Sequence, residues 1–196
     1  MLKRIFDIFL SILVLVCCLP FLIIISLLII IDSGFPVIYK QTRVGKDKKE
    51  FMIFKFRTMY RNVPSNGFLT VGARDVRITR IGYILRKYKL DELPQLFNII
   101  KGDMSLVGPR PETPNFVKLY DQEQIKVLTV NPGLTDYASL EYMNENELLS
   151  EYSDPIDAYI KYVMPAKLLL NIKYIKEKSF STDIKILLRT VFKILR

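Results

Sequence analysis

The longest apolar stretch of the chain runs from Ile5 to Ile31, and only four residues interrupt it: Asp7, Ser11, Pro20 and Ser26. A helix of about 20 residues crosses the hydrocarbon core of a bilayer, so this stretch is long enough to span one. A secretory signal peptide has a shorter apolar region followed by a small-residue cleavage site, and this stretch lacks both features. The pattern predicts a membrane helix at the N-terminus.

Pro20 stands near the middle of that stretch, where a proline removes a backbone donor and bends or breaks a helix. Each half would reach roughly 18–23 Å at 1.5 Å per residue, which is short of the ~30 Å hydrocarbon core. Lys3 and Arg4 precede the stretch, and five cations follow it: Lys40, Arg43, Lys46, Lys48 and Lys49. Positive charge on both flanks is typical of cytoplasmic segments. We therefore expect a re-entrant helix over residues 1–34, broken near Pro20, with a kinked single span as the alternative.

The rest of the chain predicts a small mixed domain. Residues 35–60 alternate apolar and polar positions around "VGKDKKE", which predicts a β-hairpin, and residues 61–79 are rich in turn formers. Helical spacing predicts helices over 80–90 and from Asp91 to Lys101, with Gly102 as the C-terminal cap of the second. Further helices are expected over residues 115–129, 145–149, 155–163 and 166–178.

The C-terminal segment, residues 181–196, predicts a basic amphipathic helix. One face carries Lys185, Arg189, Lys193 and Arg196, and apolar residues cover much of the remainder. Such a helix suits a membrane interface, with an ordinary surface helix packed on the domain as the alternative. The predicted fold class is mixed α/β and mainly helical. It combines a membrane helix-break-helix over 1–34 with a cytoplasmic, membrane-associated domain over 35–196, which holds a short β-hairpin and amphipathic interfacial helices.

The composition directs attention to anionic partners. The net charge is +9 and half of the residues are hydrophobic, with a sequence pI near 9.5 and a mean hydropathy of +0.20. Membrane lipids with acidic headgroups or phosphorylated substrates would match this charge. Few aromatic residues alternate with the basic clusters, so nucleic acid is not an expected partner.

Cysteine and histidine usage excludes several kinds of site. Cys17 and Cys18 are adjacent within the apolar stretch, and they cannot build a disulfide framework or a zinc site. They serve as small apolar residues or, alternatively, as palmitoylation sites. The chain contains no histidine, which removes Ser–His and Cys–His nucleophile pairs. Acid–base chemistry must then come from carboxylates, lysine, tyrosine or a metal.

The segment "KLDELPQLFN" places Asp91 and Glu92 at the start of a predicted helix. Helix capping alone would explain an acidic pair there, with Asp91 as the N-cap. The basic residues around the pair are too many for one ion pair: Lys55, Arg57, Arg86 and Arg110. A carboxylate close to a phosphate needs a divalent cation or several arginines, and Mg²⁺ suits an oxygen-rich site. The residues therefore predict a phosphoryl-transfer site at a membrane surface.

The long run "RITRIGYILRKYKLDELPQLFNIIKGDMSLVGPRPE" resembles the signature of the bacterial sugar transferases, the monotopic phosphoglycosyl transferases. "KFRTM" at 55–59 and "KRIFDI" at 3–8, followed by Pro20, also match. The resemblance implies a re-entrant helix in the bacterial inner membrane, with the catalytic domain on the cytoplasmic face. It also implies transfer of a sugar-1-phosphate from a UDP-sugar to undecaprenyl phosphate, with release of UMP. The oligomeric state is left open.

The resemblance also implies roles for individual residues. Asp91 corresponds to the nucleophile that forms a phosphosugar–enzyme intermediate, and Glu92, with Asp91, corresponds to the acidic magnesium site. The expected phosphate-binding set is Lys55, Arg57, Arg86, Arg110, Gln95 and Asp103, of which Gln95 and Asp103 match the motif without a defined role. Lys3, Arg4 and Pro20 correspond to the membrane segment.

One region departs from the family pattern. Many members continue "PGITG" and a downstream "GRN", whereas this chain reads "PGLTDYASLEYMNENE". Sugar or uridine contacts made there cannot be carried over, which leaves the sugar undetermined. Two other functions stay open at this point. One is a non-catalytic basic module anchored to the membrane, and the other is a glycosyltransferase that moves the sugar without its phosphate.

Overall fold

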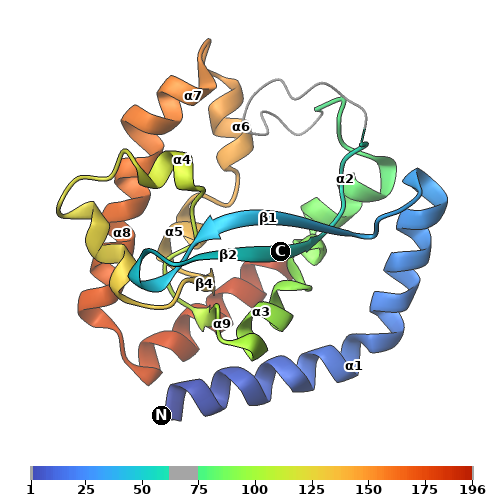
Figure 1. The fold of residues 1–196 in the computed structure, drawn as a ribbon, viewed down its shortest axis with the longest axis horizontal. Helices are drawn as coiled ribbons and strands as arrows, with labels where there is room; N and C mark the ends of the chain where they lie inside the picture. The colour runs from blue at the N-terminus through green and yellow to red at the C-terminus, as the bar shows by residue number, and fades with distance from the viewer. Residues whose placement is uncertain (1, 62–74, 196) are drawn as a thin grey trace.

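The structure is a computed structural model that describes residues 2–61 and 75–195. Its first element is the 32-residue helix α1, Leu2–Ser33, with Pro20 inside it. Figure 1 shows α1 as two arms that meet at a bend, with the rest of the chain lying in the angle between them. The predicted break is therefore a bend within a continuous helix. Among the described residues, α1 is the one helix long and apolar enough to cross a membrane by length and composition.

The predicted β-hairpin is confirmed. Strands β1 (Ile38–Val44) and β2 (Glu50–Phe56) pair antiparallel, with Ile38 opposite Phe56. The short 3₁₀ turn η1 (Lys46–Lys48) joins them, within the predicted turn segment. Most of the predicted loop over 61–79 lies outside the described residues.

Two helical pieces follow the hairpin. Helix α2 spans Arg80–Lys87, and its N-cap Thr79 accepts a hydrogen bond at Oγ1 from the Gly82 amide. The 3₁₀ turn η2 (Leu90–Glu92) leads into α3 (Gln95–Lys101), which ends at Gly102 with φ +106° as predicted. The prediction of Asp91 as an N-cap is wrong, because Asp91 lies inside η2. Pro94 has no amide to donate, and the chain before it closes tighter turns such as Leu93 N–H to Leu90 O at 3.3 Å.

A second, smaller sheet was not predicted. Strand β3 (Ser105–Val107) pairs parallel with β4 (Gly133–Thr135). The two backbones approach so closely beyond β3 that a Cβ on Gly133 would overlap the backbone of Gly108. Glycine at these positions therefore permits the pairing.

The predicted helix over 115–129 is wrong. The structure has a short helix α4 (Pro114–Val117) and a separate 3₁₀ helix η3 (Gln124–Thr129). Between them, Asp121 Oδ1 accepts hydrogen bonds from the amides of Glu123 and Gln124, both at 2.8 Å. An aspartate that bonds the backbone just after it favours a turn over a continuous helix.

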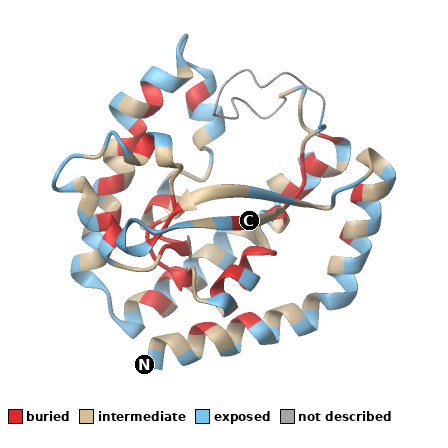
Figure 2. Ribbon diagram, viewed as in Figure 1, coloured by how far each residue is buried: buried red, intermediate tan, exposed pale blue. Residues whose placement is uncertain are grey.

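The C-terminal third is helical. Helix α5 (Tyr137–Glu141), which was not predicted, is followed by α6 (Glu145–Ser150). A long continuous helical rod comes next, made of α7 (Pro155–Ala158), the π-helix η4 (Tyr159–Val163) and α8 (Met164–Glu177). Helix α9 (Phe180–Leu195) is the last element. The helices predicted over 155–163 and 166–178 are thus contiguous. In Figure 2 the buried residues gather where the two sheets meet the surrounding helices.

The inner side of α1 is part of the core. Ile25 and Ile29 are buried against Phe56 of β2 and Leu85 of α2. In the first arm, Asp7 is buried and its Oδ2 accepts a hydrogen bond from Ser105 Oγ at 2.7 Å. The long apolar helix therefore packs on the domain along both arms while its outer side stays exposed.

Candidate active site

The acidic pair lies at the centre of a cluster of cations. Arg110 binds both carboxylate oxygens of Glu92, with 3.0 Å between Nη1 and Oε2 and a second bond from Nη2 to Oε1. Lys55, near the end of β2, places its Nζ 3.0 Å from the same Oε1. Two of the predicted phosphate-binding cations thus meet at one carboxylate.

Burial and charge set the protonation of this triad. Burial alone would raise the pKa of Glu92, but Arg110 and Lys55 outweigh it and hold that pKa well below its usual range. Glu92 in turn raises the pKa of the Arg110 guanidinium. Burial lowers the pKa of Lys55, and Glu92 opposes that shift. Ionised Glu92 therefore keeps two cations in place at the site.

Asp91 has a different environment. It is 8% exposed, and its carboxylate accepts no hydrogen bond from residues 2–61 or 75–195. Burial first, and repulsion from Glu92 second, raise its pKa, whereas Lys55, Arg86 and Lys89 act in the opposite direction. The result is a carboxylate that is available for a new partner, in an electrostatic field made by several cations.

Arg86 is the cation of α2 that faces Asp91. Its Nε donates to Thr58 Oγ1 at 2.8 Å, which fixes the guanidinium from the hairpin side. Burial lowers its pKa, and the negative charge of Asp91 opposes that shift. Between α2 and η2, Lys89 adopts the left-handed conformation with φ +55°. A non-glycine residue in this conformation costs about 1–2 kcal/mol, so the turn that presents Asp91 is strained.

The segment after β3 positions Arg110. Its flanking residues, Pro109 and Pro111, limit the backbone, and its amide donates to Oδ2 of the fully buried Asp136 at 3.2 Å. Asp136 also caps α5, since its Oδ1 accepts from the Ser139 amide at 2.6 Å. No local pattern singled out Asp136, because its contact with the Arg110 amide joins segments 26 residues apart.

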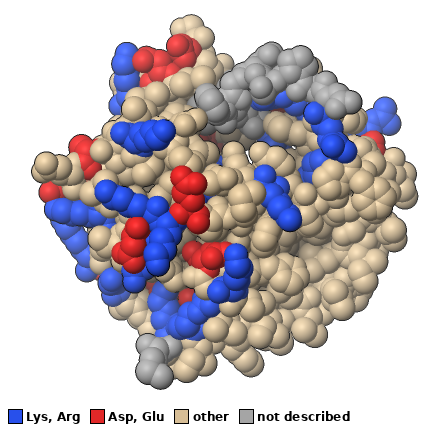
Figure 3. Space-filling model, viewed as in Figure 1, with Lys and Arg blue, Asp and Glu red and all other residues tan. Residues whose placement is uncertain are grey.

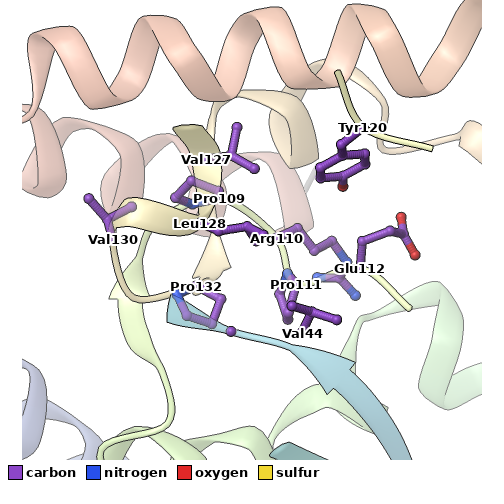
Figure 4. A pocket seen from close by; sticks show the side chains of 11 residues that line it. Val44, Pro109, Arg110, Pro111, Glu112, Tyr120, Val127, Leu128, Val130 and Pro132 are labelled. Atoms are coloured by element: carbon purple, nitrogen blue, oxygen red, sulfur yellow. The ribbon is translucent and has the colours of Figure 1, made fainter. Parts of the chain in front are cut away.

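A second polar network supports the same segment from behind. Arg43 donates to Pro111 O at 3.2 Å and to Glu112 Oε1 at 3.0 Å, and the Tyr159 hydroxyl donates to Glu112 Oε2 at 2.5 Å. Burial first, and Glu112 second, raise the pKa of Tyr159. Figure 4 shows Arg110, Glu112 and Tyr120 converging at one end of a small cavity whose other lining residues are mostly apolar. This network holds the backbone next to Arg110.

Within the described residues, three other members of the predicted phosphate-binding set form no hydrogen bond or ion pair with Glu92, Lys55 or Arg110. Arg57 is buried, and its guanidinium donates to Ser33 Oγ, Gly34 O and Phe35 O at the end of α1. Asp103 pairs with Lys101 at 3.2 Å, beyond the end of α3. Gln95 is fully buried. The charged groups of Arg57 and Asp103 thus have partners within the protein, and their phosphate-binding role stays a prediction.

The predicted membrane residues at the N-terminus bind the domain. Arg4 donates to Ile99 O at 2.7 Å and to Ile100 O at 3.1 Å, at the C-terminal end of α3. A cation there complements the helix dipole. Lys3 lies 2.5 Å from Asp183 of α9. Both side chains thus tie the first arm of α1 to the domain that carries the acidic pair.

The acidic pair fits a Mg²⁺ that takes most of its ligands from substrate and water. No cluster of three or more acidic, cysteine or histidine residues suited to a metal occurs among the described residues. Mg²⁺ commonly uses one or two carboxylates together with substrate phosphates. Asp91 has a carboxylate without a protein partner, whereas both oxygens of Glu92 already accept bonds from cations. Asp91 is thus the better placed of the two ligands.

The whole chain matches a known protein family. A sequence model described as "Bacterial sugar transferase" matches residues 1–196. The chain belongs to the bacterial sugar transferase family. Among its relatives is the Bacillus subtilis (strain 168) protein named uncharacterized sugar transferase EpsL, which is 36% identical over 195 residues, 99% of this chain and 87% of the relative.

Two further relatives carry names that state an activity. The UDP-N-acetylgalactosamine-undecaprenyl-phosphate N-acetylgalactosaminephosphotransferase of Aeromonas hydrophila is 35% identical over 98% of this chain and 43% of its own length. The UDP-glucose:undecaprenyl-phosphate glucose-1-phosphate transferase of Escherichia coli (strain K12) is 36% identical over 98% of this chain and 40% of its own length. This bacterial sugar transferase therefore spans less than half of each of these two proteins.

Proposed function

We propose that this protein transfers a sugar-1-phosphate from a UDP-sugar to undecaprenyl phosphate and releases UMP. Such a reaction starts the assembly of a surface polysaccharide or glycoconjugate. The names of the Aeromonas and Escherichia relatives support the reaction class. One observation carries the proposal: the buried Asp91, which accepts no hydrogen bond from the described residues, lies in a region that also holds the cations Lys55, Arg86 and Arg110. A carboxylate in such surroundings suits a nucleophile that attacks a diphosphate.

In the proposed first step, a carboxylate oxygen of Asp91 attacks the sugar-bearing phosphorus of the UDP-sugar. The bond from that phosphorus to the UMP oxygen breaks, UMP leaves with the electron pair, and a phosphosugar–aspartyl intermediate remains. Carboxylate nucleophiles of this kind form acyl phosphates in other enzymes. An ionised carboxylate requires no base to deprotonate it, which accounts for a site without histidine.

In the proposed second step, a phosphate oxygen of undecaprenyl phosphate attacks the same phosphorus. The bond to Asp91 breaks, and the carboxylate is regenerated as the lipid diphosphate sugar forms. Lys55 and Arg110 stabilise the charge on the transferring phosphoryl group through preorganised donors. A Mg²⁺ held by Asp91 and Glu92 would add neutralisation of the diphosphate charge.

The contacts of α1 support the re-entrant arrangement. At its N-terminal end, Arg4 bonds α3 and Lys3 pairs with Asp183 of α9. At its other end, Arg57 holds Ser33, and Asp32 Oδ2 accepts from the Ile81 amide at 3.1 Å. Both ends are thus bound to one domain, and a domain that remains on one side of a bilayer keeps both ends there. We place that domain, residues 35–196, on the cytoplasmic face of the bacterial inner membrane.

The surface agrees with this placement. In Figure 3, charged side chains gather mainly on the left of the view, whereas the lower right, where α1 bends, shows none on this face. Helix α9 also exposes apolar side chains, with Leu188 and Val191 each 54% exposed and Phe192 72% exposed. These side chains would enter the interface beside its lysines and arginines.

A nucleotide-release assay tests the proposal. Full-length enzyme with undecaprenyl phosphate and a panel including UDP-glucose and UDP-N-acetylgalactosamine should release UMP with at least one donor. Chelation of divalent cations should stop the release, and Mg²⁺ should restore it. Release of UDP instead would favour sugar transfer without phosphate, and no release with any donor would favour a non-catalytic module.

A further inference from the structure

Gln95 carries an unexplained polar group beside the acidic pair. Its side chain is fully buried, and neither Oε1 nor Nε2 has a hydrogen-bond partner among the described residues. Burying an amide without partners is unfavourable, because the hydrogen bonds that it makes with water are lost. Buried polar groups are nearly always bonded, so this amide calls for a partner that the described residues do not supply.

The backbone path puts Gln95 about one helical turn after Asp91. Leu93 and Pro94 both have helical torsion angles, so the chain stays helical from Leu90 into α3. Residues four apart on such a path lie on the same face, and helical side chains lean toward the N-terminus. The Gln95 side chain therefore leans over the turn that carries Asp91, one turn earlier.

The two carboxylates differ in the hydrogen bonds that they accept. Glu92 already accepts bonds from Lys55 and Arg110, whereas Asp91 accepts none from the described part of the chain. On this face, the Asp91 carboxylate is a hydrogen-bond acceptor without a donor among the described residues. The Gln95 amide is a donor without an acceptor among them.

We propose that Gln95 is a positioning residue for Asp91. In the substrate-loaded site, Nε2–H of Gln95 donates to one carboxylate oxygen of Asp91 and directs the other oxygen at the phosphorus. This inference rests on the proposed function. It replaces the expectation that Gln95 binds phosphate directly, and it needs no contact between Gln95 and substrate.

Asn98, one turn further along α3, provides a matched comparison. It is also fully buried, but its Oδ1 accepts from the Phe54 amide at 3.0 Å and its Nδ2 donates to Met52 O at 2.8 Å. Its amide joins α3 to β2 and has a structural role. The same helix thus carries one buried amide with partners and one without.

The experiment compares two isosteric variants of the full-length enzyme, Gln95→Met and Asn98→Leu. Gln95→Met should keep or raise the Tm, because it removes an unpartnered polar group, whereas Asn98→Leu should lower it. In single turnover, Gln95→Met should release UMP roughly tenfold to a hundredfold more slowly, with the KM for the UDP-sugar within about twofold of wild type.

Each other outcome overturns the inference. A lower Tm, or failure of Gln95→Met to fold, would show that the amide is structural. A raised KM with unchanged kcat would show that Gln95 binds substrate directly, and an unchanged single-turnover rate would show no role in the reaction. The wild-type enzyme tests the proposed function separately, because wild type that fails to release UMP refutes that function whatever the variant does.

Discussion

Arg110 and Glu92 form a two-pronged ion pair in the centre of the site, with 3.0 Å between Nη1 and Oε2. Lys55 binds the same carboxylate. Glu92 is therefore the counter-ion of two cations, Lys55 and Arg110. Under the proposed function, a diphosphate entering the site would meet cations that are already oriented, and this would lower the cost of reorganisation during phosphoryl transfer.

Replacing Glu92 tests this counter-ion role. Glu92→Gln leaves Lys55 and Arg110 without their anion, and we expect the free energy of unfolding to fall by about 2 kcal/mol. Because the folded pKa of Glu92 is depressed, the wild-type advantage is present above the ordinary value of 4.5. It shrinks as the pH falls below that value toward the lower pKa of the folded state. Denaturant unfolding of both proteins across this pH range measures the difference, and a pH-independent difference would contradict the ion-pair explanation.

Lys55 should contribute to the reaction at the substrate diphosphate, whereas an exposed lysine of the same hairpin should not. Lys55→Met is expected to lower kcat/KM for the UDP-sugar by about 10²–10³, the loss seen when one charge-stabilising donor is removed. Lys49→Met is the matched control, because Lys49 is exposed at the turn of the same hairpin. Steady-state UMP release measures both variants. Equal activity in the two would rule out a role for Lys55 at the diphosphate.

A substitution of Arg57 can distinguish a structural role of this cation from a role in substrate binding. Its guanidinium bonds three groups at the end of α1, and lysine cannot reproduce that forked geometry. Arg57→Lys should lower the Tm and leave the KM for the UDP-sugar within about twofold of wild type. A tenfold rise in KM at unchanged Tm would restore the phosphate-binding role expected from the sequence.

The topology of α1 is testable with single cysteines. After Cys17→Ala and Cys18→Ala remove the native thiols, Leu2→Cys places one reporter at the start of α1, and Lys40→Cys places the other in β1, beyond the end of α1. A re-entrant helix predicts that a membrane-impermeant thiol reagent labels both positions from the cytoplasmic side in vesicles of known orientation. Labelling of the two positions from opposite sides would establish a kinked single span instead.

Local patterns predicted the elements whose signals lie within a few residues. The alternation of residues 35–60 predicted the hairpin, and Gly102 marked the end of α3. Strands β3 and β4 have three residues each, too few for a periodic pattern, and their pairing depends on the close approach of Gly108 and Gly133. Such contacts between distant segments leave no local signal.

In the site, too, local patterns predicted some features, whereas contacts between distant segments left no signal. The motif placed Asp91, Glu92 and the nearby cations in one region, but it could not say which cation binds which carboxylate. Arg57 and Arg86 look alike in sequence, yet one holds α1 and the other faces Asp91. The partners of an arginine are set by packing between distant elements, and a local pattern does not contain that information.

The nucleophile assignment also makes a stability prediction. Asp91 is buried and its pKa is raised, so the ionised form destabilises the fold at neutral pH. Asp91→Asn should therefore keep or raise the Tm while it abolishes UMP release. Thermal unfolding in detergent measures the first effect. A strong loss of stability would indicate that Asp91 is mainly structural.

The covalent intermediate is the central claim, and mass spectrometry of the enzyme tests it most directly. Enzyme incubated with a UDP-sugar, without undecaprenyl phosphate, should release one UMP per active site and gain the mass of a phosphosugar on the peptide that contains Asp91. Addition of undecaprenyl phosphate should remove that mass, and Asp91→Asn should never acquire it. UMP release that requires both substrates, with no adduct at Asp91, would contradict the mechanism.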